Sequence, residues 1–310
     1  MTMLDISRCT SHQELEEVVD LCDRAFPNTP REYFHRHVLC DATLRPEHTL
    51  VGRKDGRIVS SVQIFPRVCW MEGQTLPFAG IGNVATDPAE RKMGYAGLIM
   101  EEAIRCMKGD GFPLSTLTTT INAYYEKFGY VTVPREVAVF TAAPDVPKSG
   151  GVRRFQRPRD FNRVRELYDN YNRESAGPIA RDERYWQAQV QFCGEDPTLF
   201  LLMERNARAQ GYIRAAEEKG TVQVLEFGAV DSVPATFATL LGALCAAKPG
   251  KPVKMFLSER ERKRISPLPP HAIQTDTDTM ILILDEASRR AAEEKLIRPG
   301  AYMFWGSDFF

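Results

Sequence analysis

Residues 82–97 combine glycines, cations and the start of a helix in a pattern that could bind a phosphate-bearing ligand. They read Gly-Asn-Val-Ala-Thr-Asp-Pro-Ala-Glu-Arg-Lys-Met-Gly-Tyr-Ala-Gly and connect an apolar strand to an amphipathic helix. Gly94 and Gly97 leave the main chain open to a bulky anion, and Arg91 and Lys92 add positive charge. Amide N–H groups at the helix start add the positive end of the helix dipole. A pyrophosphate is the natural occupant, although this pattern by itself fits a solvated turn equally well.

A second motif follows at residues 122–130, which read Asn-Ala-Tyr-Tyr-Glu-Lys-Phe-Gly-Tyr. In this order and at this separation, the two motifs resemble motifs A and B of the GCN5-related N-acetyltransferase (GNAT) superfamily over residues 80–131. The resemblance implies acetyl-CoA as the substrate, with its pyrophosphate on the loop and its pantetheine arm along the preceding strand, in a cleft between two splayed strands. The cofactor-binding residues that it implies are Val84, Ala85, Thr86, Arg91, Lys92, Met93, Gly94, Tyr95, Ala96, Gly97, Thr120 and Asn122.

Acetyl transfer to an amine needs a base, an oxyanion donor and a donor to the leaving thiolate. An alkylamine whose ammonium form has a pKa of about 10.4 is deprotonated, and so able to attack, in only about one molecule in 2,500 near neutral pH. A backbone N–H near Val84 could bind the oxyanion. Tyr125 lies where the family places its acid, and a phenol of pKa about 10 is a weak acid beside a thiol of about 8.5, so we expect hydrogen-bond donation to the sulfur. The alternatives are an aromatic packed under the cofactor for Tyr125 and a helix cap for Asn122.

The base is less evident from the motifs. Many members of the superfamily carry a carboxylate on the strand before the loop, where this chain has Asn83. Residues 301–310 are rich in aromatics and should dock rather than extend into water. In this they resemble tandem-GNAT proteins of the enhanced-intracellular-survival (Eis) type, whose terminal carboxylate acts as the base of the first domain. By that resemblance we expect the Phe310 carboxylate to be the base, with burial raising its pKa. A tail that only joins the two domains is the alternative.

The elements that must position these residues occur twice along the chain, as helix, helix, hairpin, long strand, helix and strand. A stretch rich in Pro and Gly, 142–151, separates the two halves. We expect an α/β fold of the α+β type, with two tandem GNAT-like domains, each a mixed, mostly antiparallel twisted sheet flanked by helices. The expected domains are 1–145 and 146–285, followed at 286–310 by a helix and an aromatic tail that docks toward the first domain. The Eis-type proteins carry a third domain, which this sequence is too short to contain in full.

The second half differs from the first at the start of its own helix. It carries Asp231 there and lacks the glycines and cations of the first loop, so we expect it to shape the acceptor cleft without binding CoA. The charge run 259–264, Glu-Arg-Glu-Arg-Lys-Arg, is expected to be a solvated face or loop.

Composition excludes several classes of function. The chain of 310 residues has 40 Lys and Arg against 41 Asp and Glu, a net charge of −1, so it has no global electrostatic reason to bind nucleic acid or an anionic membrane. It shows no apolar run long enough to span a bilayer and no secretory signal. The seven cysteines are scattered and form no CxxC pair, so we expect a cytoplasmic protein without a metal site.

These observations predict an acetyl-CoA-dependent N-acetyltransferase. A primary amine of a small molecule or peptide would attack the thioester directly in a ternary complex. Two alternatives remain open: a non-catalytic acyl-CoA sensor, which the missing strand carboxylate favours, and transfer of a longer acyl group. The sequence also leaves the acceptor and any homo-oligomer open.

Overall fold

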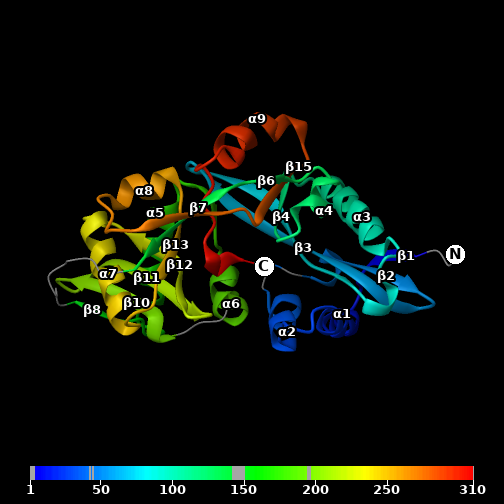
Figure 1. The fold of residues 1–310 in the computed structure, drawn as a ribbon, viewed down its shortest axis with the longest axis horizontal. Coiled ribbons are helices and arrows are strands. Elements are labelled where there is room, and N and C mark those ends of the chain that lie inside the picture. Colours follow the sequence, from blue (N-terminus) through cyan, green and yellow to red (C-terminus); the bar gives the residue numbers. More distant parts are fainter. Residues whose placement is uncertain (1–3, 42, 44, 142–150, 194–196, 310) are drawn as a thin grey trace.

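The computed structural model describes residues 4–41, 43, 45–141, 151–193 and 197–309, which form two lobes that lie side by side (Figure 1). Each lobe is a twisted sheet flanked by helices, as the sequence predicts. The first half contains β1 (Asp5–Arg8), α1 (His12–Ala25), α2 (Arg31–Leu39), β2 (Thr49–Lys54), β3 (Arg57–Met71), β4 (Gln74–Thr86), α3 (Tyr95–Gly109), β5 (Leu114–Thr118), α4 (Asn122–Glu126), β6 (Val131–Thr132) and β7 (Arg135–Phe140).

The second half repeats this order. It contains β8 (Val152–Arg154), α5 (Phe161–Asn172), β9 (Ala176–Ile179), α6 (Glu183–Cys193), β10 (Phe200–Arg205), β11 (Arg208–Glu218), β12 (Thr221–Ala229), α7 (Val233–Ala247), β13 (Val253–Leu257), α8 (Glu259–Ile265), β14 (Ala272–Asp276), β15 (Thr279–Ile283) and α9 (Arg289–Ala292), which a π-helical turn at Glu293–Ile297 continues.

The two sheets exchange one strand each. The first has the order β1-β2-β3-β4-β5-β15-β6, with β9 attached to β3, and the second has the order β8-β10-β11-β12-β13-β7-β14. Read side by side, the two orders match position by position, except that β15 from the second half and β7 from the first half occupy each other's places. The domain boundary expected after residue 145 therefore separates the repeats in sequence, while strand pairing crosses it in both directions.

The first sheet opens at one end of its parallel strand pair. β4 and β5 pair only at Ala79 with Ser115 and at Gly80 with Thr116, and β4 then continues to Thr86 paired with β3 on its other side. Strands that part in this way leave backbone N–H and C=O groups of β4 without a strand partner on the open edge. This opening is the feature of the fold that positions the candidate site.

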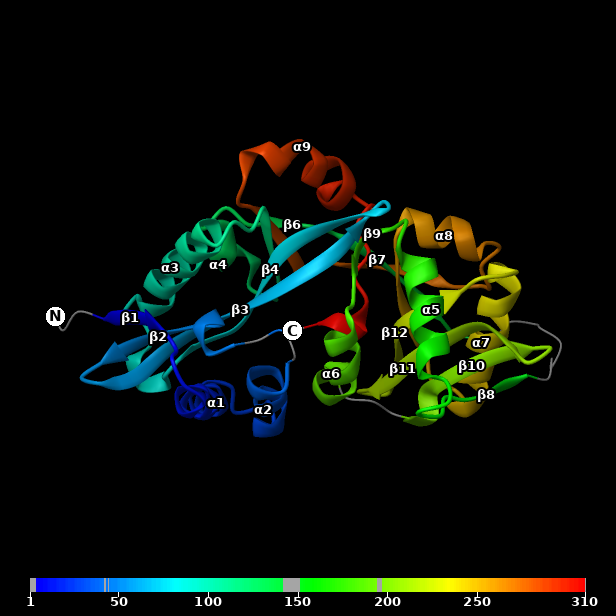
Figure 2. The ribbon, with the colours of Figure 1, turned by 180° about the vertical axis from the view of Figure 1, so that it is seen from behind.

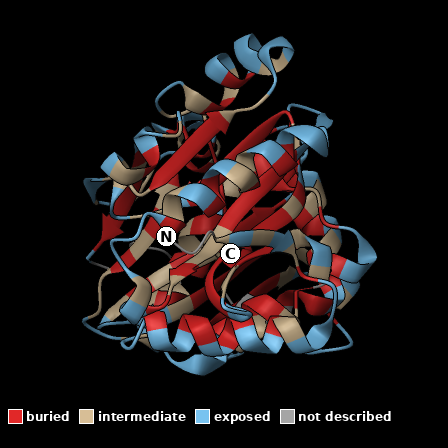
Figure 3. Ribbon diagram, turned by 90° about the vertical axis from the view of Figure 1, so that its right-hand side faces the viewer, coloured by how far each residue is buried: buried red, intermediate tan, exposed pale blue. Residues whose placement is uncertain are grey.

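Helices cover both faces of the first sheet. α3 packs on one face through Ile99, Met100 and Ala103, which share a buried cluster with Val62 of β3. α1 and α2 cover the other face. Figure 3 shows that the buried residues follow the sheets while exposed ones follow the outer faces of the helices, as amphipathic helices require. Within the described residues, no helix is long and apolar enough to cross a bilayer.

β3 and β4 form one long hairpin. The sequence pattern predicts separate strands at Ile58–Phe65 and Val68–Met71, but Pro66 is accommodated within β3, opposite Ala79. β2 pairs with β3 only as far as Gln63, so the missing N–H of Pro66 costs no ladder hydrogen bond with that neighbour. The hairpin turn consequently reaches the second lobe near β9 and α8 (Figure 2).

The aromatic segment Tyr302–Trp305 docks between the lobes, which confirms that it is not a free tail (Figure 1). Phe304 contacts Phe78 of β4 with ring centroids 6.5 Å apart. Trp305 is 1% exposed and donates through Nε1 to the side chain of Asn172 in α5, at 2.8 Å. The segment therefore packs against both halves.

Candidate active site

The connection between β4 and α3 is held in one conformation by Asp87 at its start. The Asp87 carboxylate accepts from the N–H of Ala89 at 3.1 Å and pairs with Arg24 at 3.3 Å and Arg57 at 3.2 Å. Burial by itself would raise the pKa of this carboxyl, but the N–H of Ala89 and the two guanidinium groups outweigh it and lower the pKa overall. Asp87 therefore stays ionised as a structural cap and is not placed to accept a proton.

The rest of the connection forms a cradle at the start of α3. Lys92 and Gly94 have φ angles of 66° and 83°, which turn the chain sharply before the helix begins at Tyr95. Apart from the adjacent residues and the backbone of α3 itself, a Cβ atom at Gly94 or Gly97 would meet nothing within 4 Å, so the space over both glycines is open. Arg91 anchors the loop to the end of α1 by donating to the carbonyl of Ala25 at 2.7 Å. The open space, the amide groups and the cations fit the pyrophosphate that the sequence predicts.

The last residues of β4 form a β-bulge next to the opening. The register with β3 shifts between Ser61 and Gln63, and Asn83 has a φ angle of 48°. Ser61 donates to the carbonyl of Asn83 at 3.2 Å, and Ser60 donates to that of Ala85 at 2.9 Å. Residues 84–86, predicted to line the pantetheine arm, are thus fixed from the β3 side while their other edge faces the opening.

Asn83 takes part in a chain of amide hydrogen bonds that sequence reasoning missed. Its side-chain amide donates to Gln63, and Gln63 in turn donates to the carbonyl of His37 in α2 at 3.3 Å. Burial lowers the pKa of His37, which favours the neutral imidazole near neutral pH. The sequence signal was available as the polar residues Ser60, Ser61 and Gln63 within an otherwise apolar strand. This network connects α2 to the strand that forms one side of the opening.

Tyr125 lies on α4, which follows the other arm of the opening. The ring is 8% exposed and stands edge-on to Tyr124 and Tyr130, at centroid distances of 5.0 and 6.1 Å. Burial, with a smaller contribution from Tyr124, raises the pKa of Tyr125 to about 12. No hydrogen bond from its hydroxyl to another described residue is present, so that group can donate to a ligand.

Asn122 has a structural role in the described residues. Its side-chain amide donates to Thr132 at 2.8 Å and to the carbonyl of Thr277 at 2.9 Å, and Ile121 rather than Asn122 precedes the helix as its cap. The capping alternative for Asn122 is therefore wrong. Contacts of Thr120 and Asn122 with a pantetheine arm stay predictions. Phe310, the predicted base, lies outside the described residues.

The split sheet and the glycine cradle both lie in the first half of the chain. Residues 6–133 match the family model described as the acetyltransferase (GNAT) domain. Over 162 residues the chain is 27% identical to an uncharacterized N-acetyltransferase of Streptomyces avermitilis. That alignment covers 47% of this chain and 38% of the relative, so it spans well under half of the relative's length. The family match therefore covers the part of the chain that contains the split sheet and the glycine cradle, and it bears out the resemblance predicted from the two motifs.

Solved structures extend the likeness to both halves. A probable N-acyltransferase of unknown function from Enterococcus faecalis superposes with a TM-score of 0.73 at 19% identity, covering 92% of this chain and 73% of that one. Eis1 from Mycobacterium abscessus superposes with a TM-score of 0.68 at 17% identity, covering 93% and 76%. At such identities these likenesses show the fold alone. They confirm the tandem GNAT-like architecture.

Proposed function

We propose that this protein transfers the acetyl group of acetyl-CoA to a primary amine. The observation that carries the proposal is the continuous path from the open edge of β4 to the glycine cradle at the start of α3. A thioester bound along this path would place its carbonyl at the opening, beside the bulge at Asn83. The family match of residues 6–133 supports acyl transfer from an acyl-CoA in general. The proposal goes beyond the family match by naming acetyl as the transferred group and a primary amine as the acceptor.

Different groups of the chain would stabilise the oxyanion, assist the leaving thiolate and accept the proton of the amine. Backbone N–H groups near Val84 would stabilise the oxyanion as it forms, since the edge of β4 that faces β5 has no strand partner beyond Gly80. Tyr125 would donate a hydrogen bond to the departing thiolate. The base is proposed to be the carboxylate of Phe310, and the docking of Tyr302–Trp305 between the lobes supports it. Asn83 cannot serve, since an amide does not accept a proton at neutral pH.

The second half would close the acceptor cleft without binding CoA. Its connection between β12 and α7 spans only residues 230–232, whereas the connection in the first half spans 87–94. The shorter connection leaves no loop that could cradle a pyrophosphate. The shape and charge of the acceptor cleft would then come from both lobes.

The test is to measure release of the CoA thiol by the purified chain, with acetyl-CoA and a panel of amines that includes a polyamine, an aminoglycoside, an amino acid and a lysine peptide. The proposal expects saturable, amine-dependent thiol release. Saturable binding of acetyl-CoA without any release above uncatalysed hydrolysis would identify a sensor instead. Faster turnover with a longer acyl-CoA would show that the transferred group is longer than acetyl. If no acyl-CoA bound at all, the proposal would be wrong.

A further inference from the structure

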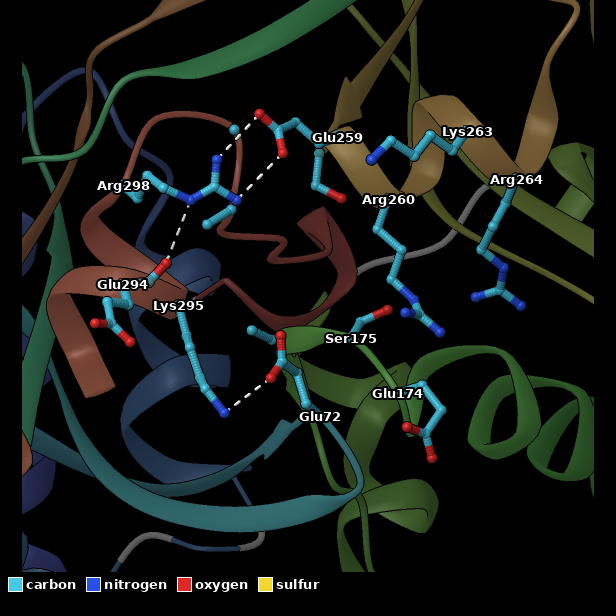
Figure 4. Close-up of a pocket in the computed structure, with 14 residues that line it drawn as sticks. Glu72, Glu174, Ser175, Glu259, Arg260, Lys263, Arg264, Glu294, Lys295 and Arg298 are labelled. Carbon is cyan, nitrogen blue, oxygen red and sulfur yellow. Dashed lines mark hydrogen bonds and ion pairs between the residues drawn. The ribbon is translucent and has the colours of Figure 1, made fainter. Parts of the chain in front are cut away.

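A cavity of about 440 Å³ lies at the end of the β3–β4 hairpin, where segments from both halves meet (Figure 4). Its walls are the hairpin turn at Glu72, the connection between α5 and β9, the helix α8, and the chain that follows α9. Backbone hydrogen bonds join these walls, from Glu72 to Ser175 at 3.1 Å and from Glu259 to Gly300 at 2.8 Å. The volume lies within the range of small-molecule sites.

The charge run 259–264, expected to be a solvated face or loop, forms the helix α8 with Glu259, Arg260 and Lys263 exposed, and this helix is one wall of the cavity. Ser258 caps it by accepting from the N–H of Glu261, a capping pair that the sequence already contained. Arg260, Lys263 and Arg264 are three and four residues apart, so they share one helix face, and all three line the cavity. Figure 4 shows them together on that side.

The cavity has an excess of cations once its ion pairs are counted. Glu72 pairs with Lys295 at 2.8 Å, Glu259 with Arg298 at 3.1 Å, and Glu294 with Arg290 at 3.1 Å. Of the lining residues, this leaves Glu174 as the remaining carboxylate against Arg260, Lys263 and Arg264. Among the described residues, none forms an ion pair with Arg260 or Lys263. The lining carries five cations against four carboxylates, and Arg290 pairs with Glu294 from outside it, so the cavity would attract an anion.

A buried hydroxyl adds a neutral donor to the same wall. Ser175 is 2% exposed and lines the cavity, and its Oγ has no hydrogen-bond partner among the described residues. Since it has no partner among the described residues and lines the cavity, this hydroxyl is free to donate to a ligand there. In Figure 4 Ser175 lies next to Arg260.

We propose that this cavity binds a small molecule through a phosphate monoester group. Such a group carries close to two negative charges near neutral pH, and its oxygens accept from guanidinium, ammonium and hydroxyl donors at once. The site is separate from the one that would hold CoA, because the 13 residues of β4 lie between them and span roughly 40 Å at about 3.3 Å per residue. The proposal does not depend on the acyl-transfer activity.

The experiment is a calorimetric titration of the whole chain with inorganic phosphate and with glycerol phosphate, in the presence of saturating dephospho-CoA, which carries the pyrophosphate but no phosphate monoester, so that the first-half cradle is occupied. We expect saturable binding of both probes at about millimolar concentration or tighter. Arg260→Ala combined with Lys263→Ala should weaken it about tenfold or more. Ser175→Ala should weaken it severalfold while leaving the melting temperature unchanged or higher, because the lost hydroxyl has no partner among the residues that the structure describes.

The matched control removes two exposed cations elsewhere, Arg208→Ala with Lys219→Ala, and should bind the probes as the wild type does. Citrate in place of phosphate separates a phosphate site from a general anion site. Absence of saturable binding, equal binding by the Arg260 and Lys263 double variant, or tighter binding of citrate than of glycerol phosphate would each overturn the proposal.

Discussion

Burial determines what the hydroxyl of Tyr125 can do. With a pKa raised to about 12, it lies some 3.5 units above a thiol of about 8.5, so full proton transfer to a thiolate would be uphill by about 5 kcal/mol. A hydrogen bond to the thiolate has no such cost, and charge-assisted bonds of this kind are the stronger ones. The structure thus strengthens the interpretation of Tyr125 as a donor that stays protonated.

We predict that Tyr125→Phe lowers kcat for acetyl transfer about 100-fold, in the range found for loss of one preorganised donor. The affinity for CoA and the free energy of unfolding should change little, since no described residue receives a hydrogen bond from the hydroxyl. Because the pKa is about 12, wild type and variant should share the same alkaline limb in their pH–rate profiles up to about pH 10.

The matched control for this variant is Tyr124→Phe. Its hydroxyl is buried and also has no partner in the described residues, so its removal should affect neither stability nor rate. Steady-state kinetics at several pH values decide the matter. Equal kcat for Tyr125→Phe and wild type would leave Tyr125 as a packing residue.

Single residues were predictable where their role is local. Gly94 and Gly97 open the start of a helix through their own backbone, so the chain around them was enough to expect it. Asn122 was not predictable in the same way, because its amide binds the carbonyl of Thr277, which lies 155 positions further along the chain. Likewise, the residues adjacent to Asn83 in the sequence do not indicate that its side-chain amide donates a hydrogen bond to Gln63.

At the level of elements, periodicity located most helices and strands but could not assign strands to sheets. β7 and β15 are both short apolar strands, and either would fit the place between two strands of either sheet. Their exchange is decided by pairing with β13 and β5, contacts distant in sequence. For the charge run 259–264 the pattern left a solvated face and a loop open, and the cap at Ser258 is the local feature that decides for the helix α8.

The start of α3 permits a prediction in which stability and binding change in opposite directions. Gly97 is the third residue of the helix, where Glu is favoured by the helix dipole and has a better helix propensity than Gly by about 0.5–1 kcal/mol. Gly97→Glu should therefore fold at least as stably as the wild type. Its carboxylate would occupy the open space over the loop and repel a pyrophosphate, so CoA affinity should fall about tenfold or more.

Gly97→Ala is the control that adds a Cβ without charge, and it should keep most of the affinity because that Cβ would contact nothing beyond its chain neighbours and its own helix backbone. Thermal unfolding and calorimetry with CoA measure the two effects separately. If Gly97→Glu bound CoA as tightly as the wild type, the pyrophosphate would have to lie elsewhere.

At the level of the whole molecule, a fully buried cluster of charges fastens the C-terminal segment to the second lobe. Arg181 of the chain before α6 contacts Asp308 at 2.9 Å and Glu226 of β12 at 2.6 Å, and the side chains of all three are inaccessible to solvent. Arg214 lies 3.7 Å from Glu226 and completes a set of two cations and two carboxylates. Such a cluster is costly to desolvate, and removal of one member leaves an uncompensated buried charge.

This cluster should make stability depend on pH in the acid range. Burial opposes ionisation of Glu226, but Arg181 and Arg214 outweigh it and lower the pKa to about 2 from 4.5. A group whose pKa is lower in the folded state contributes stability that is complete above its unfolded pKa and is lost as pH falls toward the folded value. The contribution of Glu226 is therefore present above pH 4.5 and declines between about 4.5 and 2.

The variant Glu226→Gln lacks the titrating carboxyl group, so its comparison with the wild type measures how much Glu226 contributes to the pH dependence of stability. At neutral pH the variant should be less stable than the wild type by about 3 kcal/mol, because Arg181 and Arg214 lose a buried counter-charge. Below pH 4.5 the difference in the free energy of unfolding should narrow by about 1.4 kcal/mol per pH unit. The reason is that residue 226 takes up a proton on unfolding in the wild type but not in the variant. Urea unfolding at a series of pH values measures the difference, with the exposed Glu166→Gln as the control that should show neither effect. A gap that stays constant as the pH is lowered would mean that Glu226 does not carry the charge that holds the C-terminal segment in place.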